Sequence, residues 1–273
     1  MTQNWRLITS PARSGAFNMA LDEAMLIFAS QKKVPPTLRL YQWDPPTVSL
    51  GYGQPVKDVS LEAISQKGWQ LVRRPTGGRA ILHTDEITYS ITAPVDDPVV
   101  SGTLLDSYHR IAQALVLALS RLGLTANADH IYPQQQEKSF LNPICFEVPS
   151  NYEITVFGKK LIGSAQARKS GGVLQHGSLP LWGDLTRITE ILKYPSEHDQ
   201  INAAKILLDH ATTLQSATGK TFDWEQASLA FIGAFSECLN LEFENSQPSA
   251  EESILVEKLI KTKYGSEEWN LRI

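Results

Sequence analysis

Cysteine is scarce in this sequence. The 273 residues include two cysteines, Cys145 and Cys238, which are too few for a disulfide framework and lack the spacing of a metal site. The chain has no apolar run near the roughly eighteen residues that a membrane helix needs. Its N-terminus, MTQNWRLITSPARSG, lacks the apolar segment of a signal peptide. These absences predict a cytoplasmic protein with no membrane partner.

Positive charge is not in excess either. The formal net charge is −4 at pH 7, whereas a protein that binds nucleic acid needs a basic surface to neutralise phosphates. Nucleic acid is therefore not an expected partner. Basic residues still gather locally, at Arg73, Arg74, Arg79, Lys159, Lys160, Arg168 and Lys169. Local positive charge on an acidic chain favours an acidic partner or substrate.

Several familiar motifs are missing. The chain has no HExxH, no P-loop, no dinucleotide-binding glycine fingerprint, no internal repeat and no low-complexity tract. With 42% apolar and 20% charged residues, it has the composition of a globular protein that buries a full core. We expect a single domain over residues 1–273, with a core to about residue 245 and a C-terminal helix and polar tail over about 246–273.

Hydrophobic periodicity predicts an α+β fold. Strands are expected at 4–8, 38–43, 47–53, 69–72, 87–91, 152–156, 161–162 and 173–179, and the last three form an antiparallel meander. Helices are expected at 17–28, 59–66, 103–122, 184–193, 201–209, 225–239 and 250–263, with Asn18 as N-cap of the first. This order favours an α+β fold with a mixed sheet. Residues 127–150 show no period and are expected to form a long lid or binding loop.

The stretch 69–93 organises the chain. Between its two strands lie Arg73, Arg74, Gly77, Gly78 and Arg79. Adjacent glycines let backbone N–H groups approach a ligand closely, and arginines suit an anionic or strongly polar ligand. A basic β-turn with solvated arginines is the alternative, because Gly-Gly alone is a weak motif.

Cys145 and Lys160 are candidates for chemistry. Nearby positive charge favours a thiolate nucleophile, and a lysine can donate a hydrogen bond to a thioester carbonyl. From spacing alone, a small buried Cys145 and a surface hairpin Lys160 are the simpler alternative. Cys238, on a predicted helix, is interpreted as a core residue. His83 and His176 are candidate bases, although a lone histidine beside a strand is more often a structural hydrogen-bonding residue.

Five segments together resemble the lipoate/biotin protein ligase superfamily. They are NMALDEAML (18–26), RRPTGGRAILH (73–83), ITYSI (87–91), CFEVPSNYEITVFGKKLIGSAQARKSGGVLQHGS (145–178) and KYGSEEWN (263–270). They are spread over nearly the whole chain, and within the superfamily they look most like the cysteine-dependent octanoyltransferases of the LipM type. The resemblance implies an α+β fold with a mixed, largely antiparallel sheet flanked by helices, as in the catalytic domains of lipoate-protein ligase A and biotin ligase.

The resemblance also implies roles for residues. Cys145, just before the segment FEVP (146–149), matches the acyl-accepting cysteine of the octanoyltransferases, and Lys160 matches the catalytic lysine of the superfamily. The RRxxGG segment, which lines the acyl pocket in the family, falls on Arg73, Arg74, Gly77 and Gly78. The other substrate-binding residues implied in this way are Arg79, His83, Tyr89, Gly163, Ser164, Ala165, Gln166 and His176.

The sequence departs from the adenylating ligases at two positions. Arg79 stands where those ligases usually have a third glycine, which agrees with the transferases. Thr84 follows His83 where they have aspartate, and Asp85 comes one place later, so the role of Asp85 is open. Because the chain ends soon after Trp269, we expect none of the extra C-terminal domain that many lipoate ligases carry.

The activity implied is transfer of an octanoyl group from octanoyl-acyl carrier protein, through a Cys145 thioester, to a lysine of a lipoyl domain. Such domains include the glycine-cleavage H protein and the E2 subunit of 2-oxoacid dehydrogenases. This reaction requires no cofactor and no metal. The alternative is a lipoate-protein ligase that uses ATP and Mg²⁺ and forms lipoyl-adenylate, with Cys145 incidental. Two further alternatives are a non-catalytic binding relative and an amidotransferase that moves lipoyl groups between proteins.

Overall fold

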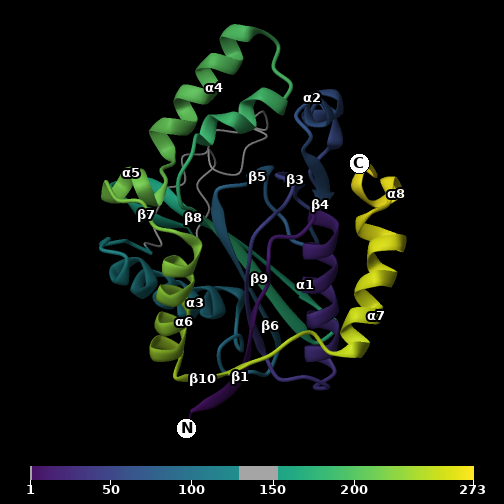
Figure 1. Ribbon diagram of the computed structural model, residues 1–273, viewed down its shortest axis with the longest axis vertical. Coiled ribbons are helices and arrows are strands. Elements are labelled where there is room, and N and C mark those ends of the chain that lie inside the picture. The colour runs from purple at the N-terminus through teal and green to yellow at the C-terminus, as the bar shows by residue number, and fades with distance from the viewer. Residues whose placement is uncertain (1, 129–152) are drawn as a thin grey trace.

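The computed structural model describes residues 2–128 and 153–273, so almost all of the loop predicted at 127–150 lies outside the described residues. The strands are β1 Gln3–Thr9, β2 Thr37–Tyr41, β3 Thr47–Leu50, β4 Gln70–Arg73, β5 Ile81–His83, β6 Glu86–Pro94, β7 Ile154–Val156, β8 Lys159–Lys169, β9 Gly172–Pro180 and β10 Leu241–Asn245. In the described chain they form a large sheet, ordered β10-β1-β2-β6-β9-β8-β7, and a small sheet, ordered β4-β3-β5 (Figure 1). In the large sheet β1 pairs in parallel with β2 and β10, whereas β2, β6, β9, β8 and β7 pair in antiparallel fashion.

Helices cover both faces of the large sheet. Their bounds are α1 Gly15–Ser30, α2 Leu61–Gln66, α3 Leu104–Arg121, α4 Glu197–His210, α5 Leu214–Thr218, α6 Trp224–Leu239, α7 Ala250–Leu259 and α8 Glu267–Asn270. Two 3₁₀ helices, η1 Val56–Asp58 and η2 Leu185–Ile191, and a π-helical segment, η3 Ile260–Tyr264, complete the helical elements of the described chain. In Figure 1, α3 and α6 lie on one side of the strands and α1, α7 and α8 on the other. The predicted α+β class, with a mixed and largely antiparallel sheet, is confirmed. Within the described residues, no helix combines the length and the apolar character needed to cross a bilayer.

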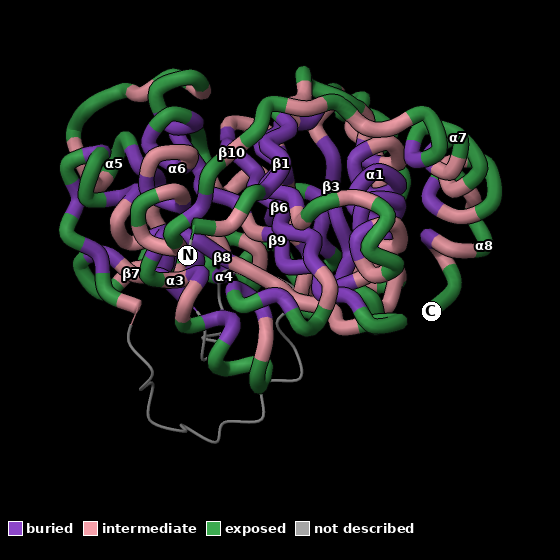
Figure 2. The backbone as a smooth tube through the Cα atoms, turned by 90° about the horizontal axis from the view of Figure 1, so that it is seen from below, coloured by how far each residue is buried: buried purple, intermediate pink, exposed green. Residues whose placement is uncertain are grey.

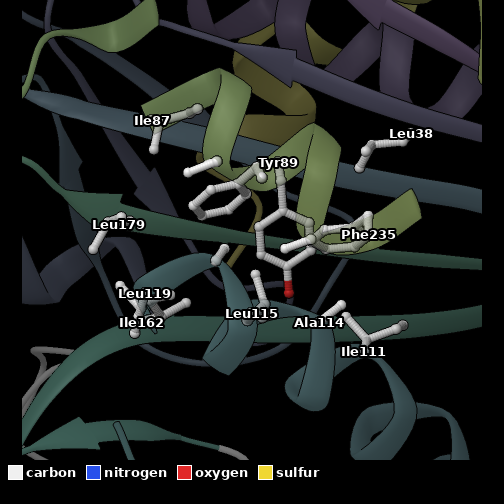
Figure 3. Packing of buried hydrophobic residues seen from close by; sticks show 14 of the residues in the cluster. Leu38, Ile87, Tyr89, Ile111, Ala114, Leu115, Leu119, Ile162, Leu179 and Phe235 are labelled. Atoms are coloured by element: carbon white, nitrogen blue, oxygen red, sulfur yellow. The ribbon is translucent and has the colours of Figure 1, made fainter. Parts of the chain in front are cut away.

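The two faces of the central strand β6 differ in polarity. It is buried along nearly its whole length, as is its neighbour β9 (Figure 2). Because side chains alternate along a strand, Tyr89 faces one side, where it packs in the core with Phe235 of α6 (Figure 3). Thr88 and Ser90 face the other side, where the Ser90 hydroxyl donates to Asp22 of α1 (2.8 Å). One face of β6 therefore belongs to the apolar core, and the other carries polar groups.

Helix α1 begins earlier than predicted. Ser14 caps it by accepting a hydrogen bond from the Phe17 backbone N–H (3.3 Å), so the prediction of Asn18 as N-cap is wrong. Asn18 is buried inside the helix, where its amide donates to the Gln42 carbonyl (3.0 Å) and accepts from Arg39 Nη2 (2.6 Å). Serine and asparagine are both good N-caps, and apolar spacing alone does not distinguish them.

The predicted meander is confirmed, since β7, β8 and β9 are successive antiparallel neighbours. The turn between β7 and β8 consists of Phe157 and Gly158, with φ values of 53° and 75°. Hairpin turns of type I′ need positive φ at both positions and favour asparagine and glycine there. Phe157 therefore adopts an unfavourable backbone conformation, and its side chain is 82% exposed.

We expect Phe157→Asn to raise the free energy of unfolding by about 0.5–1 kcal/mol, because asparagine adopts left-handed backbone more readily than phenylalanine and little buried contact is lost. Urea unfolding measures the change. Phe157→Ala is the matched control, since it removes the ring but keeps an unsuited side chain at positive φ. A Phe157→Asn protein no more stable than Phe157→Ala would contradict the interpretation.

The C-terminal segment is not the polar tail that its composition suggested. Helix α7 and the π-helical segment η3 pack along α1, and α8 packs against β4 (Figure 1). Tyr264 is buried, and the Trp269 indole N–H donates to the Arg73 carbonyl (2.8 Å). The elements β5, α5 and β10 were also missed. Each spans five residues or fewer, which is too short to carry a clear period.

Candidate active site

A cavity of about 370 Å³ lies where the small sheet meets the large sheet. Its walls come from β3 and β5, from β6, β8 and β9, and from the loop between β4 and β5. Most of the predicted site residues line it: Arg74, Gly77, Gly78, Arg79, His83, Lys160, Gly163, Ser164, Ala165, Gln166 and His176. The fold therefore brings segments that are far apart in the sequence to one cavity. Cys145 lies outside the described residues.

Arg74 stabilises the loop between β4 and β5, called here the glycine loop because it contains Gly77 and Gly78. It is only 3% exposed, and its guanidinium donates to the carbonyls of Gly77 (2.8 Å) and Arg79 (2.8 Å). It also donates to the carbonyl of Ser49 on β3 (3.0 Å). The alternative of a turn with solvated arginines is therefore wrong for Arg74. Its buried guanidinium stabilises the loop that forms part of the cavity wall.

Two glycines allow the loop to pack this closely. Gly78 has a φ of 99°, in the region that favours glycine. A Cβ atom built on Gly51, at the end of β3, would lie 1.9 Å from the Gly78 carbonyl oxygen. Any side chain at Gly51 would therefore displace the loop that forms one wall of the cavity.

Arg73 differs from the prediction, because it does not line the cavity. It is fully buried, and its guanidinium donates to the carbonyls of Gly51 (2.8 Å), Gln54 (2.6 Å) and Asn270 (3.0 Å). Arg73 is the last residue of β4, and the Arg74 N–H still donates to the Leu50 carbonyl of β3 (3.0 Å). The alternation of side chains therefore continues to Arg74, and the two arginines do not reach the same space. Arg73 instead ties the small sheet to the C-terminal segment.

Lys160 is held in the cavity wall by a buried carboxylate. Its Nζ lies 2.5 Å from Glu153 Oε1, and both side chains are 4% exposed. Both residues line the cavity. The alternative of Lys160 as a surface hairpin lysine is therefore wrong. Its neighbour Lys159 lies at the surface instead and donates to the carbonyl of Leu208 (2.5 Å).

His83 belongs to a series of buried hydrogen bonds. Its Nδ1 lies 2.7 Å from Glu86 Oε1 and its Nε2 2.8 Å from Ser49 Oγ. An ionised carboxylate can only accept, so Nδ1 carries a proton and, in the neutral ring, Nε2 accepts from the Ser49 hydroxyl. The ring stacks on Trp43 at 4.0 Å between centroids, and Arg74 Nη1 also donates to Ser49 Oγ (3.1 Å). These contacts fix the orientation of the imidazole in the cavity wall.

His176 connects the glycine loop to α1. Its Nε2 lies 2.6 Å from Thr76 Oγ1 and its Nδ1 3.4 Å from Asp22 Oδ2. Burial lowers the pKa of His176 although the Asp22 carboxylate opposes the effect, so the ring is neutral at neutral pH. For Asp22, burial alone would raise the pKa, but His176 and Arg39 together hold it below its ordinary value. Both histidines thus make the structural hydrogen bonds that the alternative interpretation expected.

Tyr89 also differs from the prediction, because it lies beneath the cavity rather than in its lining. Its hydroxyl lies 2.7 Å from Ser164 Oγ and accepts from Gln175 Nε2 (3.0 Å). Gln175 accepts in turn from Gln166 Nε2 (2.9 Å). Burial raises the pKa of Tyr89 to about 12, so its hydroxyl stays neutral. Tyr89 therefore supports the two lining residues Ser164 and Gln166 from below.

Asp85, whose role the sequence left open, does not line the cavity. Its carboxylate pairs with Arg187 on η2, and its backbone carbonyl accepts from the Leu181 N–H (2.8 Å). These contacts fasten the short turn between β5 and β6 to the segment that follows β9. Asp85 is thus a structural residue in the turn between β5 and β6.

Seven polar or aromatic residues line the cavity without having been predicted: Tyr41, Trp43, Ser49, Thr88, Tyr108, Glu153 and Ser178. For Glu153 a signal was present, because it stands seven residues before Lys160 across a tight hairpin. Trp43 and Ser49 look like ordinary strand residues in the sequence, and only the pairing of β3 with β5 brings Ser49 to His83. The described residues contain no group of three or more His, Cys, Asp or Glu side chains placed to hold a metal ion.

Comparison with known proteins agrees with this geometry. The family model of the lipoyl protein ligase A/B catalytic domain matches residues 14–236. Curated relatives include octanoyltransferase LipM of Kyrpidia tusciae, 42% identical, and of Bacillus subtilis, 38% identical, each with 99% of both chains covered.

Solved structures are similar over the same length. A bipartite lipoate protein ligase from Thermoplasma acidophilum, described with its E2 lipoyl domain, has a TM-score of 0.81 at 25% identity, covering 98% of this chain and 96% of that one. Lipoate-protein ligase A bound with ATP has a TM-score of 0.78 at 25% identity, with 99% of both chains covered. The resemblance inferred from the motifs is thereby confirmed, and the chain belongs to the lipoyl protein ligase A/B catalytic domain family, among its LipM octanoyltransferases.

Proposed function

We propose that this octanoyltransferase moves an octanoyl group from octanoyl-acyl carrier protein, through a thioester on Cys145, to a lysine of a lipoyl domain. The observation that carries the proposal is the cavity with Lys160 in its wall. At about 370 Å³, the cavity falls in the range of roughly 300–1,000 Å³ typical of small-molecule sites. Likeness to octanoyltransferases over the full length supports the same reaction.

In the first half of the proposed reaction, the Cys145 thiolate attacks the carbonyl carbon of the octanoyl thioester. The new C–S bond forms, the bond to the carrier's sulfur breaks, and the carrier thiol leaves after taking a proton. The Lys160 ammonium donates a hydrogen bond to the carbonyl oxygen as negative charge develops there.

In the second half, the ε-amine of the acceptor lysine attacks the octanoyl-Cys145 thioester. A C–N bond forms, the C–S bond breaks, and the Cys145 thiolate is regenerated while the amine releases a proton. An amide is more stable than a thioester, so the transfer runs downhill and the proposed route needs neither ATP nor a metal ion.

In the proposed reaction, basic residues at the surface contact the acidic acyl carrier protein. Arg73 and Arg74 are buried, so they cannot meet a carrier, although their sequence cluster suggested it. Lys169 is 68% exposed, and Lys159 lies at the surface of the β7–β8 hairpin. Complementary charge at such positions raises the association rate.

The test uses the full chain with octanoyl-acyl carrier protein and an unmodified lipoyl domain, without ATP and with EDTA present. Intact-protein mass spectrometry of the lipoyl domain should show one octanoyl group that resists hydroxylamine, as an amide does. A reaction without enzyme is the control. A lipoyl domain modified only when lipoate, ATP and Mg²⁺ are supplied would overturn the proposal in favour of the ligase alternative.

A further inference from the structure

Glu153 and Lys160 form a buried ion pair in the cavity wall. Glu153 directly precedes β7, and Lys160 lies near the start of β8. The Lys160 Nζ to Glu153 Oε1 distance is 2.5 Å, and each side chain is 4% exposed. The pairing of β7 with β8 shifts register between Ile154 and Thr155, next to the pair. Such irregularities re-aim side chains near functional sites.

Glu153 is the sole carboxylate among the described residues that line the cavity. The other ionisable lining groups come from several elements: Tyr41, Arg74, Arg79, His83, Tyr108 and His176. Arg74, His83 and His176 make the hydrogen bonds described above. The segment after α4 also packs against Lys160, where the Thr212 N–H donates to the Lys160 carbonyl (3.0 Å). The titratable residue at the end of α4 is His210, which is exposed and whose Nδ1 lies 2.8 Å from the Ile206 carbonyl oxygen. The described neighbours of Lys160 therefore include one anionic partner, Glu153.

Burial penalises a charged group, and an opposite charge at hydrogen-bond distance offsets that penalty. A buried ammonium that loses its counter-charge gives up its proton more readily. The form of Lys160 that donates most strongly to a developing oxyanion is the ammonium, because charge-assisted hydrogen bonds are roughly twice as strong as neutral ones. The carboxylate of Glu153 thus favours the form of Lys160 that the reaction uses.

We propose that Glu153 is a positioning residue for octanoyl transfer: it keeps Lys160 charged and fixes its Nζ in the cavity wall. The inference rests on the proposed function, in which Lys160 donates to the thioester carbonyl. Glu153 itself need not touch the acyl group.

The variant Glu153→Gln isolates the charge, because glutamine keeps the shape and an acceptor oxygen for Lys160 Nζ. Without the counter-charge of Glu153, we expect the buried Lys160 of this variant to become neutral more readily than in the wild type. The ratio of variant to wild-type transfer rates should therefore fall as pH rises, reaching about tenfold loss near pH 9 from near parity at about pH 6. Glu153→Asp keeps the charge at a shorter reach and should restore much of the rate at high pH.

The first measurement follows transfer to the lipoyl domain across this pH range for wild type, Glu153→Gln and Glu153→Asp. Glu190→Gln is the matched control, because it removes the carboxylate of the exposed Lys67–Glu190 pair and should leave the profile unchanged. A merely structural role for Glu153 would lower the rate equally at every pH. That outcome, or a Glu153→Gln profile identical to the wild type, overturns the inference.

The second measurement reads the charge of Lys160 without any substrate. Acetic anhydride at limiting concentration labels neutral amines, and mass spectrometry of the peptide locates the label, with the adjacent Lys159 as internal reference. Lys160 should become reactive at lower pH in Glu153→Gln than in wild type. If labelling shifts as expected but the wild type transfers no octanoyl group, the proposed function fails while the charge-holding role of Glu153 stands. If labelling of Lys160 does not shift in an active enzyme, the inference fails alone.

Discussion

Cys145→Ala is expected to abolish octanoyl transfer, with the rate falling by at least about 10³-fold, because the variant has no thiol to carry the acyl group. Lys160 and the cavity would remain, so the variant should still bind the octanoyl chain. Direct attack of the acceptor amine on the carrier thioester is the sole route left in that variant. Such a route lacks the acyl-enzyme that divides the reaction into two easier steps.

The second cysteine is not suited to replace the first. Cys238 lies on α6, packs against the apolar core and does not line the cavity. Burial, together with the neighbouring Glu237, raises the pKa of the Cys238 thiol, so it is protonated at neutral pH. A thiol is a far weaker nucleophile than a thiolate.

Intact-protein mass spectrometry after incubation with octanoyl-acyl carrier protein checks the prediction. Wild type should carry a hydroxylamine-sensitive octanoyl adduct, and Cys145→Ala should carry none. Cys238→Ala is the matched control and should keep both the adduct and the transfer rate. A Cys145→Ala protein that still transfers at the wild-type rate would exclude the thioester mechanism.

Strand alternation explains which site residues the sequence could and could not assign. The RRPTGG segment drew attention to Arg73 and Arg74 together, yet adjacent strand residues face opposite sides, and only Arg74 lines the cavity. The same rule separates Tyr89, in the apolar core, from its neighbour Thr88, which lines the cavity.

Other features depend on contacts that no local pattern encodes. The sequence predicted the meander and most of the helices, because their periods extend over many residues. It did not predict that Asn270 would accept the Arg73 backbone N–H (2.8 Å) from 197 residues away. Nor could it predict that Asp22, in a helix, would meet His176 of β9 across the interior. Such long-range polar contacts are formed only when the sheet order brings the elements together.

Asp22→Asn is expected to lower the free energy of unfolding by about 3–5 kcal/mol, because it removes one charge from a buried ion pair. Asp22 is fully buried and accepts from Arg39 Nη1 (2.8 Å), the Tyr41 hydroxyl (2.9 Å) and the Ser90 hydroxyl (2.8 Å). Asparagine keeps one acceptor oxygen but leaves the buried Arg39 guanidinium without its counter-charge. Urea unfolding at neutral pH measures the loss. The matched control is Asp96→Asn, in an exposed pair with Lys32, which should change stability little.

The same pair predicts how the difference depends on pH. Although burial alone would raise the pKa of Asp22, His176 and Arg39 hold it below its ordinary value of 3.8. A carboxylate with a lowered pKa in the folded state contributes stability that is complete above the unfolded value and is lost as pH falls through the folded one. The contribution of the Asp22 charge should therefore persist from about pH 7 to about pH 5 and be lost in more acidic solution. Because Asp22 also opposes the lowering of the His176 pKa, the difference between wild type and Asp22→Asn should grow between about pH 7 and about pH 5 before it shrinks. A difference no larger than that of Asp96→Asn, or one that does not shrink below about pH 4, would mean that the Asp22–Arg39 pair does not stabilise the fold.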